Sequence, residues 1–208
     1  MKFFKDILCR ALIFSVLISP WLLSASAERV DYCDSIPEDF AGWNSSVSLP
    51  KFDPEMGTLT AVDLLCILNL SGQVLMENTN PLPGNFTISL FGALTGELPS
   101  SENIYMPINH IIEGNLSGYD GASDYAGASG LNSTESVPTD EASMSISNLE
   151  DFLAGAPGER ITVPVRLEIG SLVKMPGNSM GGVISKAGAK ICVFYTYGAS
   201  SAEDGGIK

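Results

Sequence analysis

Short stretches in which apolar and polar residues alternate follow one another along most of the chain. Between residues 58 and 70 most even positions are apolar, namely Val62, Leu64, Cys66, Leu68 and Leu70. Asp63 and Asn69 occupy odd positions. A period of two residues is the pattern of a β-strand with one face on a core. We therefore expect the even positions of this strand to point inward.

The same pattern recurs in seven further segments, at 47–52, 73–78, 85–94, 102–112, 142–147, 161–169 and 190–197. Turn-forming pairs such as Pro157-Gly158 and Pro176-Gly177 separate several of them. One short helix is expected at 148–154, with Asn148 as its N-cap. A Gly-, Ser- and Asp-rich stretch between 113 and 141 has little apolar periodicity and is expected to be a long loop. The pattern predicts an all-β, antiparallel β-sandwich, jelly-roll or Ig-like, with one long loop and at most one short helix.

The first 27 residues have the pattern of a signal peptide. Lys2, Lys5 and Arg10 precede an apolar run at 11–23, and small residues at 24–27 form a cleavage site. We expect cleavage after Ala27. The run is shorter than the roughly 20 residues of a membrane-spanning helix, which favours a cleaved signal peptide. The alternative is an uncleaved N-terminal anchor, and the chain would attach to a membrane only in that case.

The remaining residues suffice for one domain. We divide them into a polar, turn-rich lead at 28–46, the β-sandwich at 47–198 and a polar tail at 199–208.

Charge narrows the choice of partners. The chain has 11 basic and 24 acidic residues and a formal net charge of −13. Nucleic-acid binding needs clustered Lys and Arg, so this class is excluded as a function. The excess of negative charge favours solubility after export and makes divalent cations candidate partners.

Export changes how the cysteines and asparagines are interpreted. After cleavage Cys33, Cys66 and Cys192 remain, so one disulfide at most can form within the chain. Five Asn-X-Ser/Thr motifs mark candidate glycosylation sites, with chance occurrence as the alternative: Asn44, Asn69, Asn85, Asn115 and Asn132.

Strand alternation also predicts the cysteine pairing. Ile191, Val193 and Tyr195 share one face of the last strand, so Cys192 lies on the other. Cys66 belongs to the apolar face of its own strand, and a Cys66–Cys192 bond would need one strand to present the wrong face. We expect this pair to be unbonded and any bridge to join Cys33 to Cys192 on the outer face.

Four sequence blocks, in order, resemble the choice-of-anchor E domain family of exported prokaryotic surface domains: 49–54 with 57–60, 77–78, 119–121 with 124–130, and 187–189 with 195–197. The resemblance implies an extracytoplasmic, β-sandwich-like domain with no established activity or catalytic residues. Members often continue into a C-terminal anchor, whereas residues 198–208 are short and polar.

Asp120 and Asp124 are the best candidates for site chemistry. They lie four residues apart in a glycine-containing turn, where their carboxylates and nearby carbonyls would offer the oxygen ligands that calcium prefers. Asp53 and Glu77 are candidate outer ligands. The alternative is that all four residues form or cap turns and strand ends.

Catalytic chemistry finds little support. His110 is the single histidine, it lies between apolar neighbours, and no nucleophile-elbow pattern surrounds a serine. Tyr105, Tyr119 and Tyr125 lie in or beside the predicted long loop and offer aromatic faces to a sugar.

The sequence thus predicts a secreted or cell-surface module, not an enzyme, that binds or supports an unidentified surface polymer or protein. It is a candidate for glycosylation and for stabilisation by Ca²⁺. The alternative is a secreted hydrolase acting on surface polymers.

Overall fold

The structure is a computed structural model that describes residues 27–199, without the side chains of 136–138 and 199. The expected signal peptide, apart from Ala27, and most of the expected tail lie outside these residues. No helix in the described part of the chain is long and apolar enough to cross a membrane.

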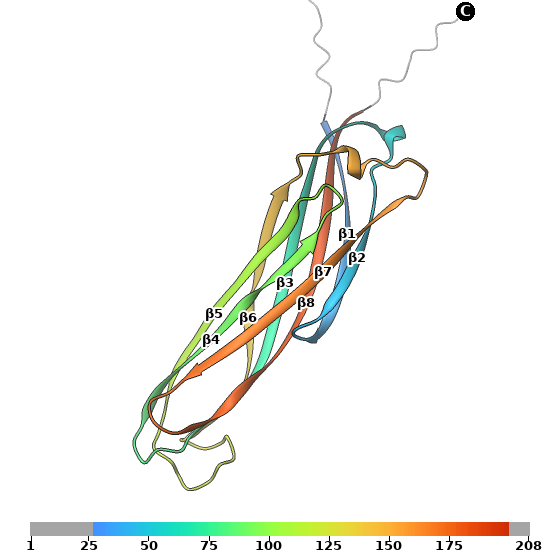
Figure 1. The fold of residues 1–208 in the computed structure, drawn as a ribbon. Coiled ribbons are helices and arrows are strands. Elements are labelled where there is room, and N and C mark those ends of the chain that lie inside the picture. Colours follow the sequence, from blue (N-terminus) through green and yellow to red (C-terminus); the bar gives the residue numbers. More distant parts are fainter. Residues whose placement is uncertain (1–26, 200–208) are drawn as a thin grey trace, which may run out of the picture.

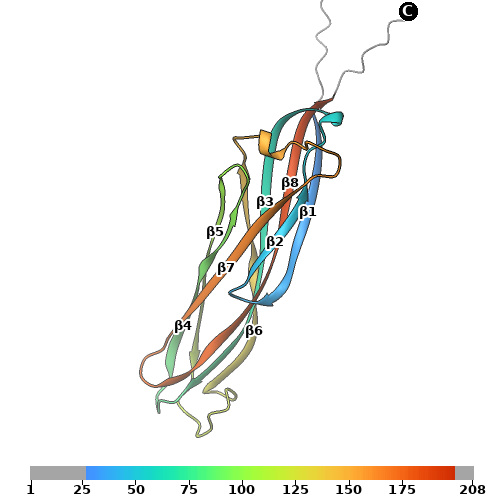
Figure 2. The same cartoon turned by 45° about the vertical axis from the view of Figure 1, so that its right-hand side comes forward.

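Eight strands form two four-stranded antiparallel sheets (Figures 1 and 2). One sheet has the order β1-β8-β3-β6, here sheet A, and the other the order β2-β7-β4-β5, here sheet B. The strands are β1 (Ala27–Phe40), β2 (Asn44–Pro50), β3 (Gly57–Asn78), β4 (Gly84–Glu97), β5 (Asn103–Leu116), β6 (Gly130–Ser145), β7 (Arg160–Lys174) and β8 (Ser179–Ala199).

Strand pairing identifies the sandwich as a jelly roll. The first strand pairs with the eighth, the second with the seventh, the third with the sixth and the fourth with the fifth. The chain is therefore one long antiparallel hairpin, whose two arms run side by side and pass together from sheet to sheet. This confirms the expected sandwich and selects the jelly roll over the Ig-like alternative.

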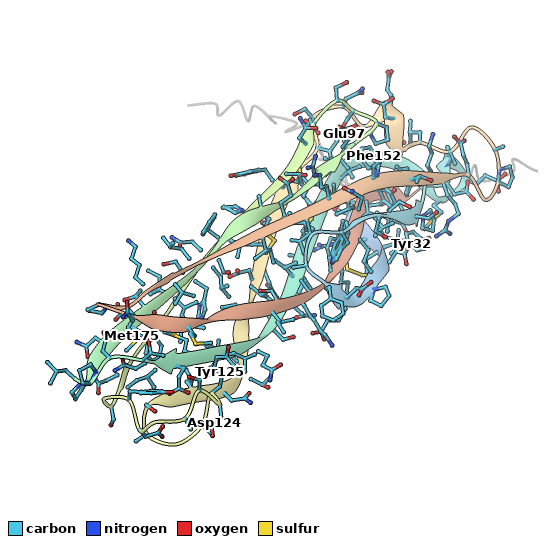
Figure 3. All side chains as sticks on the ribbon, turned by 60° about the horizontal axis from the view of Figure 1, so that its bottom comes forward. Tyr32, Glu97, Asp124, Tyr125, Phe152 and Met175 are labelled. Carbon is cyan, nitrogen blue, oxygen red and sulfur yellow. A yellow bond between two sulfur atoms is a disulfide. The ribbon has the colours of Figure 1, made fainter. Side chains whose placement is uncertain are left out.

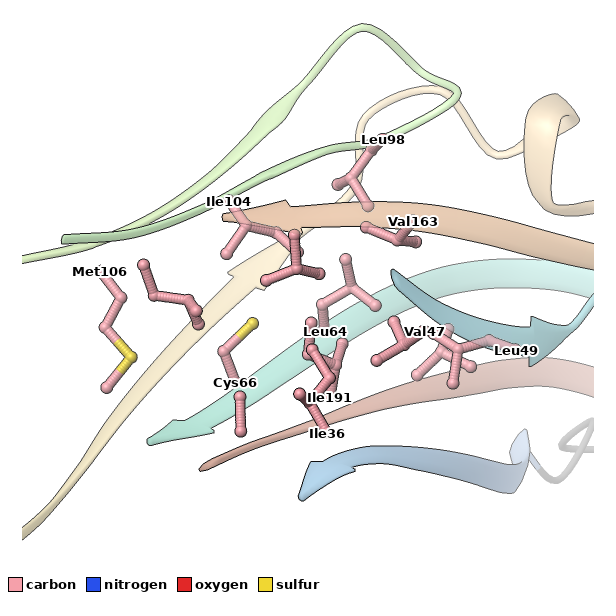
Figure 4. Close-up of a cluster of buried hydrophobic side chains, with 14 of the residues drawn as sticks. Ile36, Val47, Leu49, Leu64, Cys66, Leu98, Ile104, Met106, Val163 and Ile191 are labelled. Carbon is pink, nitrogen blue, oxygen red and sulfur yellow. The ribbon is translucent and has the colours of Figure 1, made fainter. Parts of the chain in front are cut away.

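The core lies between the inner faces of the two sheets (Figure 4). In β3 the expected even positions point inward, and Val62, Leu64 and Cys66 are each at most 2% exposed. The two segments expected at 58–70 and 73–78 are one continuous strand of 22 residues. The alternation of inward and outward residues continues through Gly72. Because glycine has no side chain, the sequence pattern did not show that the strand is continuous there.

Proline marks the edges of both sheets. Each of the four edge strands carries one proline, at Pro37, Pro50, Pro107 and Pro138; of the central strands, β7 also carries one, Pro164, and β3, β4 and β8 carry none. Proline cannot donate to a ladder, so it blocks edge-to-edge pairing with another chain.

The expected lead at 28–46 is wrong as a turn-rich segment, because residues 27–40 form β1 and residues 44–50 form β2. Both are edge strands with one face in solvent. The few inward residues of β1, among them Val30, Tyr32 and Ile36, are separated by exposed polar residues, which made the segment resemble a loop.

The expected loop between 113 and 141 is also shorter in the structure. β5 continues to Leu116 and β6 begins at Gly130, which leaves residues 117–129 as the loop. β6 is an edge strand whose inward apolar residues are few, including Leu131, Ala142 and Met144. The expected helix at 148–154 is one turn of 3-10 helix, η2 (Glu150–Phe152), and a second, η1, covers Pro54–Met56.

Candidate functional site

A polar depression of about 580 Å³ lies on the outer face of sheet B, toward the end where β4 turns into β5. It arises where β4 and β7 part, because their pairing ends at Gly96 and Val165. The next residue of β7 outward is Pro164, which has no N–H to continue the ladder.

Four residues in one register row cross all four strands of sheet B at this depression. Asn44 of β2 lies opposite Arg166 of β7, Arg166 opposite Thr95 of β4, and Thr95 opposite Tyr105 of β5. Paired residues point to the same face, so these side chains line one wall of the depression together. Tyr105 is 66% exposed.

Beyond this row lie Pro164 and the paired residues Glu97 and Asn103. Of these lining residues, the sequence identified Tyr105 and, as a glycosylation candidate, Asn44. Arg166, Thr95, Glu97 and Asn103 were missed, because only the pairing of strands distant in sequence brings them together. The one local signal is a proline within the strand-like segment 161–169.

The three tyrosines do not form one cluster. Tyr105 lies within β5, and Tyr119 and Tyr125 lie in the loop at the opposite end of the sandwich, where Figure 3 shows Tyr125 far from Glu97. Leu116, at the far end of β5, is eleven residue steps from Tyr105, which is roughly 35 Å of extended strand. The expectation that Tyr105 lies beside the long loop is therefore wrong.

At that opposite end the loop of residues 117–129 folds over the outer face of sheet A. Glu77 belongs to the outward set of β3, yet it is fully buried, because the loop covers it. Its Oε2 accepts the N–H of Tyr125 at 2.9 Å, while its Oε1 and the hydroxyl of Ser129 have no hydrogen-bond partner. A Cβ on Gly130 would lie 2.2 Å from the backbone nitrogen of Ala126, so the loop contacts the strand directly.

The next residue, Asn78, is buried and organises three segments around it. Its amide donates to the carbonyl oxygens of Leu82 at 2.9 Å and Ser117 at 2.8 Å. Its Oδ1 accepts from the backbone and side-chain nitrogens of Asn80, at 3.0 and 3.1 Å. Its own N–H donates to the carbonyl of Ser129. Asn78 therefore holds both ends of the loop.

Asp120 and Asp124 lie in this loop, and Figure 3 labels Asp124 there. Each carboxylate accepts a backbone N–H two residues on, Asp120 from Ala122 and Asp124 from Ala126, both at 3.0 Å. Asp53 likewise caps η1 by accepting the N–H of Glu55. Among the described residues, no three His, Cys, Asp or Glu side chains gather as a metal site. Calcium binding at Asp120 and Asp124 stays a prediction.

All five glycosylation candidates are exposed. Their positions divide between the two outer faces of the sandwich: Asn44, Asn85 and Asn115 in sheet B, Asn69 and Asn132 in sheet A. Asn85 and Asn115 lie directly opposite each other, and Asn115 donates its amide to Asn85 at 2.9 Å.

Cys33 and Cys192 form a disulfide with an S–S distance of 2.05 Å, which confirms the expected pairing. They lie opposite each other in the β1–β8 register, on the outer face of sheet A. Cys33 was expected in a mobile lead. The structure instead places it on a strand, so the ladder itself aligns the two sulfurs.

Cys66 is free and buried on the inner face, as the alternation predicted. Burial raises the pKa of its thiol to about 11, because the thiolate would lose its hydration. The thiol is therefore protonated and unreactive at neutral pH.

His110 continues the inward row of β5 and lies opposite Leu90. Its neighbours in that row, Ile108 and Ile112, are apolar, and this placement supports its interpretation as a packing residue.

Two of the sequence blocks behind the family resemblance meet at the end of the sandwich where β1 begins and β8 ends. The Tyr195 hydroxyl donates to the Pro50 carbonyl at 2.9 Å, and Phe52 packs between the rings of Tyr195 and Tyr197. Burial of Tyr195 raises the pKa of its phenol. The other two blocks, 77–78 and 119–130, also contact each other, because Glu77 bonds to Tyr125 and Asn78 to Ser129. The residues behind the resemblance therefore form structural joints.

No family model matches the chain, and no curated protein matches it. Solved viral structures are similar at low scores. A structure of the infectious bursal disease virus particle is 8% identical, with a TM-score of 0.22, and covers 81% of this chain and 36% of its own. Desmodium yellow mottle tymovirus is 8% identical, with a TM-score of 0.19, and covers 98% of this chain and 100% of its own. The chain thus spans about a third of the first of these. The fold assignment rests on the strand pairing.

Proposed function

We propose that the protein is an exported, secreted or cell-surface jelly-roll module that binds or supports a partner and does not catalyse a reaction. The observation that carries this proposal is the Cys33–Cys192 disulfide, which joins the first strand to the last. Structural disulfides form and persist in oxidising compartments outside the cytosol.

The glycosylation candidates support the same location. All five asparagines are exposed, and all lie on the strands of the two outer faces, where a glycan meets no core side chain. The resemblance to choice-of-anchor E domains supports it independently. We propose that the chain belongs to that family. The proposal rests on the four sequence blocks, which contact each other in two pairs, one at each end of the sandwich.

Cell fractionation of the native host, combined with intact mass of the purified protein, tests this function. We expect the protein outside the cytoplasm, with Glu28 as its first residue and two fewer hydrogens than the reduced mature chain, because the disulfide has formed. A cytoplasmic protein that retains Met1 and carries reduced Cys33 and Cys192 would overturn the proposal.

Calcium stabilisation is a separate part of the proposal, and the loop of residues 117–129 is where it applies. If Asp120 and Asp124 bind Ca²⁺, millimolar calcium raises the melting temperature by mass action. The double variant Asp120→Asn/Asp124→Asn keeps an acceptor oxygen for each turn and loses the response. A melting temperature that does not move with calcium, or that moves equally in the double variant, leaves these residues as turn formers.

A further inference from the structure

The depression on sheet B has the size and openness of a site for a small extended ligand. Its volume of about 580 Å³ lies within the range of roughly 300–1,000 Å³ that is usual for ligand pockets. The row from Asn44 to Tyr105 spans three interstrand spacings, which is about 14 Å. Backbone pairing fixes this row, so the site is present before a ligand arrives.

The side chains along this row and beside it are mostly uncharged hydrogen-bonding groups. Asn44 and Asn103 offer amides that donate and accept, and Thr95 offers a hydroxyl. Tyr105, at one end, offers an exposed aromatic face with a hydroxyl at its tip. A ligand with many hydroxyl groups and apolar ring faces would satisfy both kinds of surface at once.

The local charge disfavours an anionic ligand at this place. Arg166 is the cationic side chain of the depression, and it is already paired with Glu168. Glu97 adds a second carboxylate nearby, in a protein with a net charge of −13. The two carboxylates outnumber the one guanidinium, so the local charge disfavours a sulfate, phosphate or uronate.

We propose that this depression binds a neutral oligosaccharide, with Tyr105 stacking on a sugar ring and Thr95 and Asn103 hydrogen-bonding to sugar hydroxyls. The proposal names the ligand class of the exported binding module and so rests on that proposed function. A peptide fits less well, because Pro107 and Pro50 interrupt the sheet-B edges that a peptide strand would extend. An apolar small molecule would leave the amides and the hydroxyl unpaired.

The test uses full mature chain made in a bacterial host without N-glycosylation, so that no glycan on Asn44 occupies the depression. An array of neutral glucans, mannans, galactans and N-acetylglucosamine oligomers identifies the ligand, and titration calorimetry measures its Kd. Polygalacturonate oligomers serve as the anionic comparison.

We expect saturable binding to at least one neutral oligosaccharide and none to the anionic oligomers. Tyr105→Ala is expected to weaken this binding about tenfold or more, which corresponds to about 1.4 kcal/mol or more, and Asn103→Ala several-fold. Tyr119→Ala is the matched control, because Tyr119 is also an exposed tyrosine but belongs to the loop between β5 and β6, at the other end of the sandwich. Melting temperatures of both tyrosine variants close to that of the wild type would show that the loss of binding in Tyr105→Ala does not reflect unfolding.

The absence of binding across the neutral array overturns the inference, as does equal binding by the Tyr105→Ala and Tyr119→Ala variants. These results do not depend on where the protein resides in the cell. An extracytoplasmic protein that binds no sugar would refute the ligand class alone, whereas a cytoplasmic protein would refute the proposed function.

Discussion

Replacing Cys33 and Cys192 together by alanine is expected to lower the free energy of unfolding by about 5 kcal/mol. The disulfide closes a loop with a sequence separation of 159 residues, which is nearly the whole described chain. In the chain-entropy model, a loop of this length restricts the unfolded state by about 5 kcal/mol. The folded state loses little in the variant, because the β1–β8 ladder holds the two strands in register without the bond.

Urea unfolding of the wild type and the double variant, both without reductant, measures this difference. Wild-type protein unfolded with reductant present should match the double variant. Cys66→Ala is the control for loss of a sulfur without loss of the bond: it keeps the Cys33–Cys192 disulfide, so reductant should lower its stability as it lowers that of the wild type. A double variant within about 1 kcal/mol of the wild type would contradict the expectation and show that the bond constrains little.

The inward and outward faces of the central strands could be predicted from the sequence, because alternation there is nearly unbroken. The facing of Cys66 and of Cys192 followed directly, and with it the disulfide. β1 and β6 could not be predicted in the same way. Each is an edge strand with one solvent-facing side, so polar residues occupy most of its positions.

The sites could be predicted only where a single segment determines them. Exposure of the glycosylation candidates and capping by Asp53 follow from local sequence, and the structure agrees with both. The burial of Glu77 could not be predicted in this way. Alternation correctly places its side chain outward, but the loop of residues 117–129 then covers it. The depression on sheet B depends on four strands whose pairing no local pattern encodes.

The position of Asn78 also leads to a large expected effect, at the end of the molecule far from the disulfide. Its side chain is fully buried and makes four hydrogen bonds, to Leu82, to Ser117 and twice to Asn80. A buried group that loses its partner costs about 1–3 kcal/mol, and the net contribution of each bond is about 1 kcal/mol. Asn78→Ala is therefore expected to destabilise the fold by about 3–4 kcal/mol.

Urea unfolding measures this loss, and Asn109→Ala provides the control, because Asn109 is an exposed asparagine on β5 and should change stability by at most about 0.5 kcal/mol. Hydrogen exchange then locates the effect. The amides of Thr79, Asn80 and Leu82 and those of residues 117–129 should exchange faster in Asn78→Ala, since the loop loses the contact at Ser117. The amides of the β1–β8 ladder should exchange only through global unfolding, as in the wild type. If Asn78→Ala were as stable as Asn109→Ala, the loop would be held by its glycine contacts and Glu77 alone.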